Sequence, residues 1–196
     1  MIIGITGSIG CGKTTAAQIF KKSGFKVISA DEISHDSIKK NSAPYKKIIM
    51  EFGNGILGRG KNIDRKKLGD AVFNDNKKLK ILNSIMHPII MKEIMRQKNF
   101  YLKNFFENIV IDAPLLLETK NENIVDKVIV IKTDEKSILK RLKNKYSKEK
   151  IKRILNSQMP LNEKLRYADF IIDNSKDSKY LKKQVDDIIK KFNPKD

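Results

Sequence analysis

Short apolar runs rich in β-branched residues recur along the chain and alternate with longer amphipathic stretches. The short runs have the length and composition of strands in a parallel sheet that is covered on both faces. The pattern predicts five strands, within the sequences MIIGIT, FKVISA, NIVIDAPLLLE, DKVIVIKT and ADFIIDN. Strands that alternate with helices form parallel α/β sheets with right-handed crossovers. The predicted fold class is therefore α/β, a five-stranded parallel sheet flanked by helices.

Apolar residues at helical spacing fill the stretches between the predicted strands. A first helix is predicted over residues 14–22 with Gly24 as its C-terminal cap, and a last helix over Ser178–Phe192. Residues 32–106 separate the second and third strands, which is far more chain than one crossover needs. They carry the helical patterns YKKIIMEF, LKILNSIM and IIMKEIM and a glycine-punctuated loop, GNGILGRGKN. A second, Lys-rich helical stretch covers residues 134–157.

One stretch shows clear chemistry. Residues 7–14 read GSIGCGKT and match G-x-x-x-x-G-K-[ST] at every fixed position, directly after a predicted strand and at the start of a predicted helix. Glycines let successive backbone N–H groups point inward at a phosphate, and the helix N-terminus adds partial positive charge. Such loops direct their lysine, here Lys13, to the β- and γ-phosphates and their hydroxyl, here Thr14, to Mg²⁺. The predicted nucleotide-binding residues are Gly7, Ser8, Ile9, Gly10, Cys11, Gly12, Lys13, Thr14 and Thr15.

The charge balance is strongly positive. The chain has 41 Lys and Arg residues against 23 Asp and Glu, a formal net charge of +18. This balance is typical of nucleic-acid-binding proteins, but it also arises when codon bias towards A and T fills helix surfaces with Lys. Only six of the basic residues are Arg, and Lys is scattered rather than clustered, which favours the second explanation. In either case the positive field would attract anionic substrates.

Other compositional features limit the class of protein. The chain of 196 residues is 40% hydrophobic, enough for one buried core. No apolar run reaches the length of about 18 residues that a membrane helix needs, and MIIGITG lacks the basic region of a signal peptide. The single cysteine, Cys11, excludes an internal disulfide, and we interpret it as a small filler residue. We therefore expect a cytoplasmic protein without membrane association.

Proteins with this loop either hydrolyse the nucleotide to do work or transfer its phosphoryl group to a small molecule. The chain lacks both the N-K-x-D run that reads guanine and an aliphatic run that ends in Asp-Glu. A core with two helical insertions fits a small-molecule kinase, with one insertion for the acceptor and one as a lid. The predicted division is a nucleotide-binding core of residues 1–31, 107–140 and 159–196, an acceptor domain of residues 32–106 and a lid of residues 141–158.

The remaining motifs resemble those of the dephospho-CoA kinase family nearly from end to end. After the loop come VISADEISHD, IDRKKLGDAVFND, LNSIMHPII, IVIDAPLLLE and RILNSQMPLNEKLRYADFIIDN, each similar to a family signature and in the family's order. The resemblance implies transfer of phosphate from ATP, with Mg²⁺, to the ribose 3′-hydroxyl of dephospho-coenzyme A, the last step of coenzyme A synthesis. The expected partner is this small molecule rather than a specific nucleic acid, and the expected state is a monomer or a weak homo-oligomer.

Two aspartates follow predicted strands, at the sheet edge where open α/β folds place their sites. Asp31 could cap the following helix or accept the proton of an attacking hydroxyl, and the resemblance implies the second, catalytic role. Asp112 could shape the turn before Pro114 or organise Mg²⁺ with Thr14, and we favour the metal site. Ser29 stands where the family usually has a further aspartate, so Asp31 alone carries the role there.

Arginine placement indicates phosphate contacts, because a guanidinium suits delocalised phosphoryl charge better than an ammonium does. Arg141 and Arg153 flank the second insertion, and we assign Arg141 to the ATP phosphates and, with Lys13 and Asp31, to catalysis. Ile138 stands where the family usually has Gln. Lys145 stands where it often has a second lid arginine. These two departures put part of the family's lid chemistry in question.

The other candidates concern the acceptor and the adenine. By itself the pair His87-Pro88 indicates a structural turn, whereas the resemblance implies contact with the acceptor. Arg65 offers a cation to an anionic acceptor. His35 is either a helix-surface residue or an acceptor contact, and Glu118 is either a surface salt-bridge partner or a site residue. The residues assigned to the acceptor are Asp31, His35, Arg65, His87, Pro88, Asp112, Pro114, Leu115 and Glu118, and Asn174 is assigned to the adenine.

Two rival hypotheses stay open on the sequence. Another kinase with the same loop, for a nucleotide or a shikimate-like acceptor, would not be expected to carry DAPLLLE and MHPII in this order. A basic protein that binds nucleic acid would explain the net charge of +18 and would bind DNA or RNA in a strongly salt-dependent way.

Overall fold

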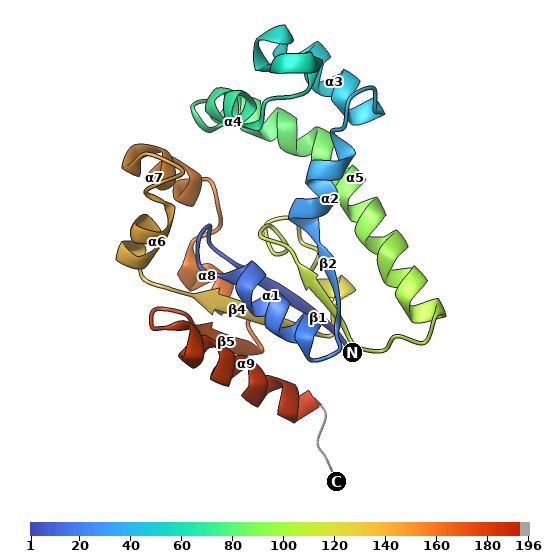
Figure 1. Cartoon of the computed structure of the whole chain (residues 1–196), viewed down its shortest axis with the longest axis vertical. Coiled ribbons are helices and arrows are strands. Elements are labelled where there is room, and N and C mark those ends of the chain that lie inside the picture. The colour runs from blue at the N-terminus through green and yellow to red at the C-terminus, as the bar shows by residue number, and fades with distance from the viewer. Residues whose placement is uncertain (193–196) are drawn as a thin grey trace. The chain divides into compact units, whose positions relative to one another are not determined.

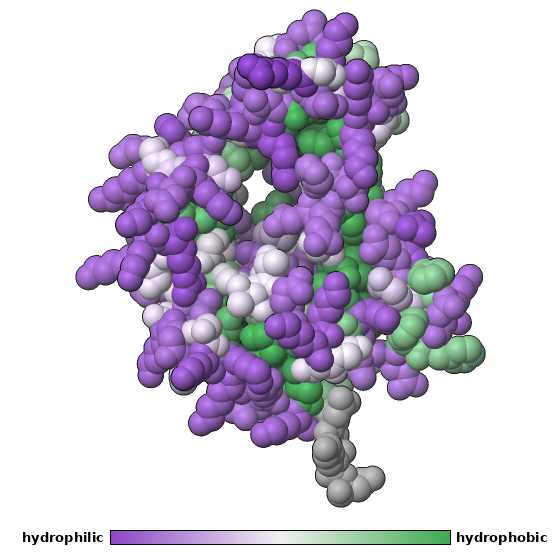
Figure 2. All heavy atoms as spheres, in the orientation of Figure 1, coloured by the Kyte–Doolittle hydropathy of each residue, from purple (hydrophilic) through white to green (hydrophobic). Residues whose placement is uncertain are grey.

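The structure is a computed structural model that describes residues 1–192. It divides into two compact units, drawn in Figure 1. The sheet unit consists of residues 1–29 and the chain from residue 98 onward, and the helical unit consists of residues 30–97. None of the helices in the described part of the chain combines the length and apolarity that a membrane span requires. Hydrophilic side chains cover most of the molecular face drawn in Figure 2.

The sheet unit is built on five parallel strands in the order β2-β3-β1-β4-β5. The strand bounds are β1 Ile2–Gly7, β2 Lys26–Ser29, β3 Ile109–Asp112, β4 Lys127–Lys132 and β5 Phe170–Asp173. Four strands lie inside their predicted apolar runs, and β1 extends one residue beyond MIIGIT, to Gly7. The predicted fold class is therefore confirmed. The carboxyl end of the central strand β1 leads directly into the glycine-rich loop.

Both faces of the sheet are covered, which explains why the strands are apolar at successive positions rather than at alternate ones. On one face, Ile129 of β4 belongs to a core with residues of α1 (Lys13–Lys22) and α9 (Ser178–Phe192). On the other face, the neighbouring Val130 belongs to a smaller cluster with residues of α8 (Leu161–Leu165). The two layers of helices hold the sheet edge, and hence the loop, in place.

The second predicted insertion is two helices rather than one stretch. α6 (Glu135–Leu142) ends before a short connection, and α7 (Lys148–Asn156) begins after it. The Ser147 hydroxyl accepts the Lys150 backbone N–H at 3.2 Å, so a side-chain cap starts the second helix. The apolar pattern did not predict two short elements of the sheet unit, because both are too short to show a period. They are the 3₁₀ turn η3 (Glu122–Ile124), before β4, and the helix α8, after α7.

The helical unit is mostly helix, as expected. It contains α2 (Ala30–Ser37), α3 (Ala43–Phe52), α4 (Arg65–Phe73) and the larger part of α5 (Asn76–Lys103). The predicted glycine-rich loop holds two 3₁₀ turns, η1 (Asn54–Ile56) and η2 (Arg59–Lys61). The apolar core of the helical unit consists of Ile48, Ile56, Leu68, Val72 and Met86.

The turn predicted at His87-Pro88 is wrong. α5 continues through both residues, so the patterns LKILNSIM and IIMKEIM belong to one helix. Proline inside a helix removes one backbone hydrogen bond and crowds the preceding turn. Burial continues on either side of it, with Met86 and Ile94 both at most 6% exposed. Packing of α5 on either side of Pro88 therefore outweighs the local cost of the proline.

Candidate active site

The phosphate loop (residues 7–14) joins β1 to α1 and requires glycine at two positions for reasons of space. Gly7 and Gly12 have φ angles of 147° and 101°, which side-chain-bearing residues rarely adopt. A Cβ atom at Gly12 would lie 2.1 Å from Asn174 Nδ2, and one at Gly7 would lie 2.4 Å from the Ile131 carbonyl oxygen. The glycines that the motif demands thus let the loop lie directly against the neighbouring backbone and side chains.

The side chain of Lys13 is held in place by hydrogen bonds to its own loop. Its side chain is buried, and its Nζ donates to the carbonyl oxygens of Gly7 and Ser8, both at 3.0 Å. The Cys11 thiol lies beside it and is also buried. Burial raises the pKa of the Cys11 thiol, and the Lys13 ammonium opposes that shift only in part. A buried, protonated thiol supports the interpretation of Cys11 as a filler residue rather than a redox centre.

Two oxygen-bearing side chains meet at the first turn of α1. Thr14 Oγ1 lies 3.3 Å from Asp112 Oδ2, and Asp112 is buried at the end of β3. Mg²⁺ prefers oxygen ligands, and nucleotide sites hold it through one or two carboxylates together with phosphates and water. No group of three or more His, Cys, Asp or Glu side chains within residues 1–192 could hold a metal ion. The Thr14 hydroxyl and the Asp112 carboxylate are oxygen ligands of the kind that suits a magnesium ion whose other ligands come from a nucleotide and water, and this assignment stays a prediction.

Arg141 and Asn174 brace the phosphate loop from outside. Arg141 Nη1 donates to the carbonyl oxygens of Gly10 and Cys11, at 3.2 and 3.3 Å, and its Nη2 donates to the Asn174 carbonyl oxygen at 2.7 Å. The buried Asn174 donates from Nδ2 to the Cys11 carbonyl oxygen at 2.7 Å. Both residues thus contact the loop backbone. Their assignments, Arg141 to the ATP phosphates and Asn174 to adenine, stay predictions.

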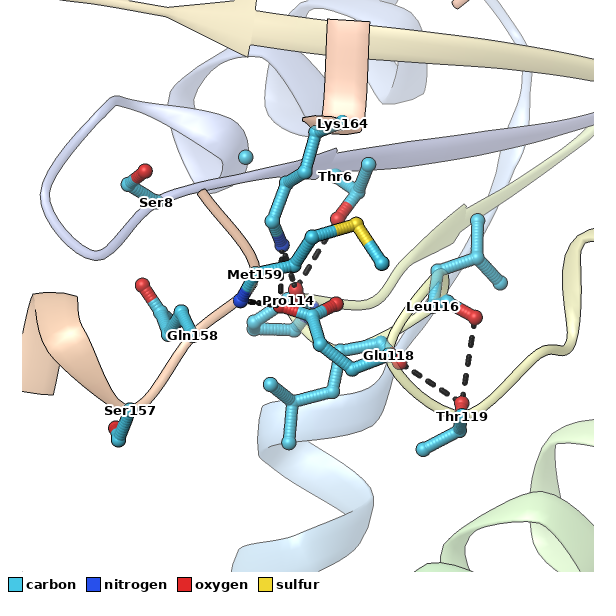
Figure 3. A network of polar contacts seen from close by, with 12 residues as sticks. Thr6, Ser8, Pro114, Leu116, Glu118, Thr119, Ser157, Gln158, Met159 and Lys164 are labelled. Atoms are coloured by element: carbon cyan, nitrogen blue, oxygen red, sulfur yellow. Dashed lines mark hydrogen bonds and ion pairs between the residues drawn. The ribbon is translucent and has the colours of Figure 1, made fainter. Parts of the chain in front are cut away.

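Glu118 forms a salt bridge, and this bridge lies in the interior. Glu118 Oε1 is 2.6 Å from Nζ of Lys164, a residue of α8 with no exposed side-chain surface. Lys164 Nζ also donates to the Pro114 carbonyl oxygen at 2.9 Å, which accepts the Thr6 hydroxyl as well (Figure 3). Burial lowers the pKa of Lys164, while its hydrogen bond to Glu118 opposes that shift. Glu118 thus forms a salt bridge, one of its two alternatives, with a lysine that is buried rather than at the surface.

Sequence reasoning did not single out Lys164 or its neighbour in the network, Gln158. One lysine among so many carries no signal by itself, and the residues around Gln158 give it no role of its own. The only available hint was that both residues stand in RILNSQMPLNEKLRYADFIIDN, one of the stretches that carry the family resemblance.

In the helical unit, three of the predicted residues lie on α2 and at the start of α4. α2 begins at Ala30, so Asp31 lies in its first turn rather than at the N-cap, and its side chain is exposed. His35 follows one turn later on the same face of the helix. Its Nδ1 lies 3.3 Å from Nη1 of Arg65, the first residue of α4. A carboxylate, an imidazole and a guanidinium are thereby gathered within this unit.

The other predicted acceptor residues are spread over both units. His87 is half-buried and Pro88 is exposed, both midway along α5 in the helical unit. Pro114 and Leu115 are half-buried and follow β3 in the sheet unit. Their contacts with an acceptor stay predictions, as do those of Asp112 and Glu118.

The departures from the family pattern have different structural settings. Ile138 is buried in an apolar cluster with Leu142 and Ile151, so its side chain fills the space between α6 and α7. Lys145 lies exposed in the connection between these helices, and Arg153 lies exposed on α7.

A family model described as dephospho-CoA kinase matches residues 1–179. The chain belongs to the dephospho-CoA kinase family. A dephospho-CoA kinase from Bacillus anthracis is 38% identical over 195 residues, which cover 98% of each protein. One from Carboxydothermus hydrogenoformans is 40% identical over 100% of this chain and 96% of its own length. The solved structure of the dephospho-CoA kinase from Campylobacter jejuni matches with a TM-score of 0.69 at 36% identity, over 97% of this chain and 96% of that one.

Membership of the dephospho-CoA kinase family defines the reaction. The chain is an ATP-dependent kinase that converts dephospho-coenzyme A to coenzyme A, the final step of coenzyme A biosynthesis. This confirms the resemblance and the activity expected from the sequence. It also decides against both rivals, the kinase for a different acceptor and the nucleic-acid-binding protein.

Proposed function

We propose that this kinase transfers the γ-phosphoryl group of ATP at the phosphate loop to the ribose 3′-hydroxyl of dephospho-coenzyme A. The observation that carries the proposal is the loop itself, with Lys13 fixed at 3.0 Å from two loop carbonyls and Thr14 beside a buried Asp112. Thr14 and Asp112 would hold Mg²⁺. When bound, Mg²⁺ would neutralise part of the charge on the nucleotide phosphates.

Lys13 and Arg141 would stabilise the charge that develops on the transferred group. Both cations contact carbonyl oxygens of the phosphate loop, so both lie beside the loop whose N–H groups would receive the phosphates. Fixed cations that need no rearrangement lower the barrier most, because the protein has met their ordering cost during folding. Residues 141–158 would act as a lid that excludes water and limits wasteful hydrolysis of ATP.

Asp31 would orient the 3′-hydroxyl and accept its proton. An exposed carboxylate in the first turn of α2 is free of the capping role that would otherwise occupy it. Arg65, paired with His35, would bind an anionic part of the acceptor. His87, Pro88, Pro114 and Leu115 would add further acceptor contacts.

The proposal is tested by a panel of acceptors that includes dephospho-coenzyme A, adenosine, a nucleoside monophosphate and shikimate. ADP release from ATP is followed with a coupled assay, in Mg²⁺ and after chelation of Mg²⁺. Of the acceptors in the panel, we expect only dephospho-coenzyme A to cause rapid ADP release from ATP. This release should be lost when Mg²⁺ is chelated. Equal ADP release with and without an acceptor, or a preference for another acceptor, would overturn the proposal.

A further inference from the structure

The peptide unit that joins Ser8 to Ile9 is held at both of its ends. Its carbonyl oxygen, on Ser8, accepts hydrogen bonds from Lys13 Nζ at 3.0 Å and from the Cys11 N–H at 3.3 Å. Its N–H, on Ile9, donates to Gln158 Oε1 at 3.0 Å. A peptide unit is planar and trans, with its C=O and N–H pointing in opposite directions, so a partner that fixes one end also fixes the other. Gln158 thereby sets the direction of one of the two carbonyls that hold Lys13.

Gln158 is itself anchored through its neighbour along the chain. The Met159 N–H donates to Glu118 Oε1 at 3.0 Å, and the same oxygen pairs with the buried Lys164 at 2.6 Å. Figure 3 shows Lys164 and Met159 converging on Glu118 beside the Pro114 carbonyl, with Gln158 on the same connecting segment. Turning Glu118 away would leave the buried ammonium of Lys164 without its carboxylate partner, which disfavours that movement.

The side chain of Ile9 joins the same part of the sheet unit. It packs against the apolar cluster of α6 and α7 that includes Leu142 and Ile151. Gly10, the next residue, lies close to the same helix, since a Cβ on it would be 3.0 Å from Leu142 Cδ1. Backbone and side chain of Ile9 are therefore both fixed by the region between α6 and α8.

We propose that Gln158 is a positioning residue for phosphoryl transfer. It acts through the Ser8–Ile9 peptide on Lys13, and the Glu118–Lys164 pair is its anchor. In this inference Glu118 supports the phosphate loop instead of contacting the acceptor. The inference rests on the proposed function for its turnover measurement, whereas the contact with Ile9 can be measured without any substrate.

The test compares Gln158→Met with Gln18→Met. Methionine keeps the length of glutamine and removes its hydrogen-bond acceptor, and Gln18 is an exposed residue of α1 that serves as the matched control. The first measurement is hydrogen exchange of the Ile9 amide in ¹⁵N-labelled protein. We expect protection in the wild type and in Gln18→Met, and exchange at least about tenfold faster in Gln158→Met. An unprotected Ile9 amide in the wild type would overturn the inference. This outcome is measured on the wild-type protein alone, so it does not depend on the folding of any variant.

The second measurement separates kcat from KM in the coupled assay. We expect Gln158→Met to lower kcat about tenfold, with the KM for dephospho-coenzyme A within about twofold of the wild type and little change in Tm. A folded Gln158→Met protein with wild-type kcat, or with a change in KM alone, would refute the positioning role. If the wild type does not use dephospho-coenzyme A, the proposed function fails by itself. The same kcat comparison is then made on ATP hydrolysis without an acceptor, together with the Ile9 exchange.

Discussion

The phosphate loop and the α2–α4 cluster (Asp31, His35 and Arg65) are built in opposite ways. In the sheet unit, the loop lies against Arg141, Asn174 and Gln158, and its lysine is buried. In the helical unit, the three side chains of the cluster are exposed. The loop would bind the phosphates of ATP, a charged group of constant shape, so its geometry is fixed before the substrate arrives. The cluster would serve the acceptor, whose position only a bound substrate defines.

The comparison is tested most severely at Asp31. We expect Asp31→Asn to lower kcat by about 10²–10⁴-fold while the affinity for ATP is preserved, because the variant loses its proton acceptor and leaves the phosphate loop untouched. The control is Asp36→Asn on the same helix. It removes only an exposed ion pair with Lys39 at 3.0 Å and should be near wild type. A change of Asp31→Asn confined to Tm would instead assign Asp31 to the stability of α2.

Lys13→Ala tests the role of the buried lysine in the phosphate loop. We expect turnover to fall at least about 10²-fold through lost electrostatic stabilisation of the transferred group. Lys21→Ala, at the exposed end of the same helix, removes an equal charge and should leave turnover unchanged. Near-wild-type activity in a folded Lys13→Ala protein, checked by circular dichroism, would defeat the assignment.

The tight fit of the loop is tested by Gly12→Ala against Gly24→Ala. Both glycines have positive φ, 101° and 94°, so both variants carry a backbone strain of about 1–2 kcal/mol. A Cβ at Gly24 meets nothing within 4 Å, whereas one at Gly12 would displace the Asn174 amide from Cys11. We therefore expect both to lower stability in urea unfolding, and only Gly12→Ala to weaken ATP binding, by at least about tenfold in calorimetry. Equal ATP affinity in the two variants would show that the loop tolerates the displacement.

The smallest effect is expected at Glu93, on α5 in the helical unit. Its hydrogen bond to Arg96, at 2.7 Å, lowers the pKa of Glu93 from 4.5 to about 2, with help from Gln97. The folded-state pKa lies below the unfolded value, so the contribution to stability is present above pH 4.5 and is lost as the pH falls towards 2. Because Arg96 is largely exposed and Glu93 is only half-buried, water screens the pair, and we expect Glu93 to contribute less than about 1 kcal/mol to stability.

Urea unfolding of Glu93→Gln and of the wild type between pH 7 and pH 2.5 measures the contribution of Glu93 to the free energy of unfolding. The stability difference should shrink as the pH falls, with kcat at neutral pH unchanged. Glu51→Gln, at an exposed position on α3, is measured alongside as the control for the loss of one carboxylate. A pH-independent difference at Glu93 would contradict the linkage.

Local order along the chain determined much of this protein. The five strands could be predicted from the sequence because strands of a sheet covered on both faces are continuously apolar. The phosphate loop was legible because its function depends on backbone geometry, which glycines at fixed spacing encode over only a few residues. Asp31 and Asp112 became candidates for a related reason, since open α/β folds place their sites at the ends of parallel strands, and their roles stay predictions.

The tertiary structure alone decided which side chains support these elements. Gln158 reaches Ile9 across 149 residues, and Arg141 reaches Gly10 across 131, so no local pattern reports either contact. The same holds for Glu118, whose partner Lys164 became distinct from the other lysines only when folding buried it. Pro88 reads as a turn by local propensity, and the packing of α5 on either side overrode it. Propensity acts between neighbours in sequence, whereas burial and hydrogen bonding act between neighbours in space, and those exist only once the chain has folded.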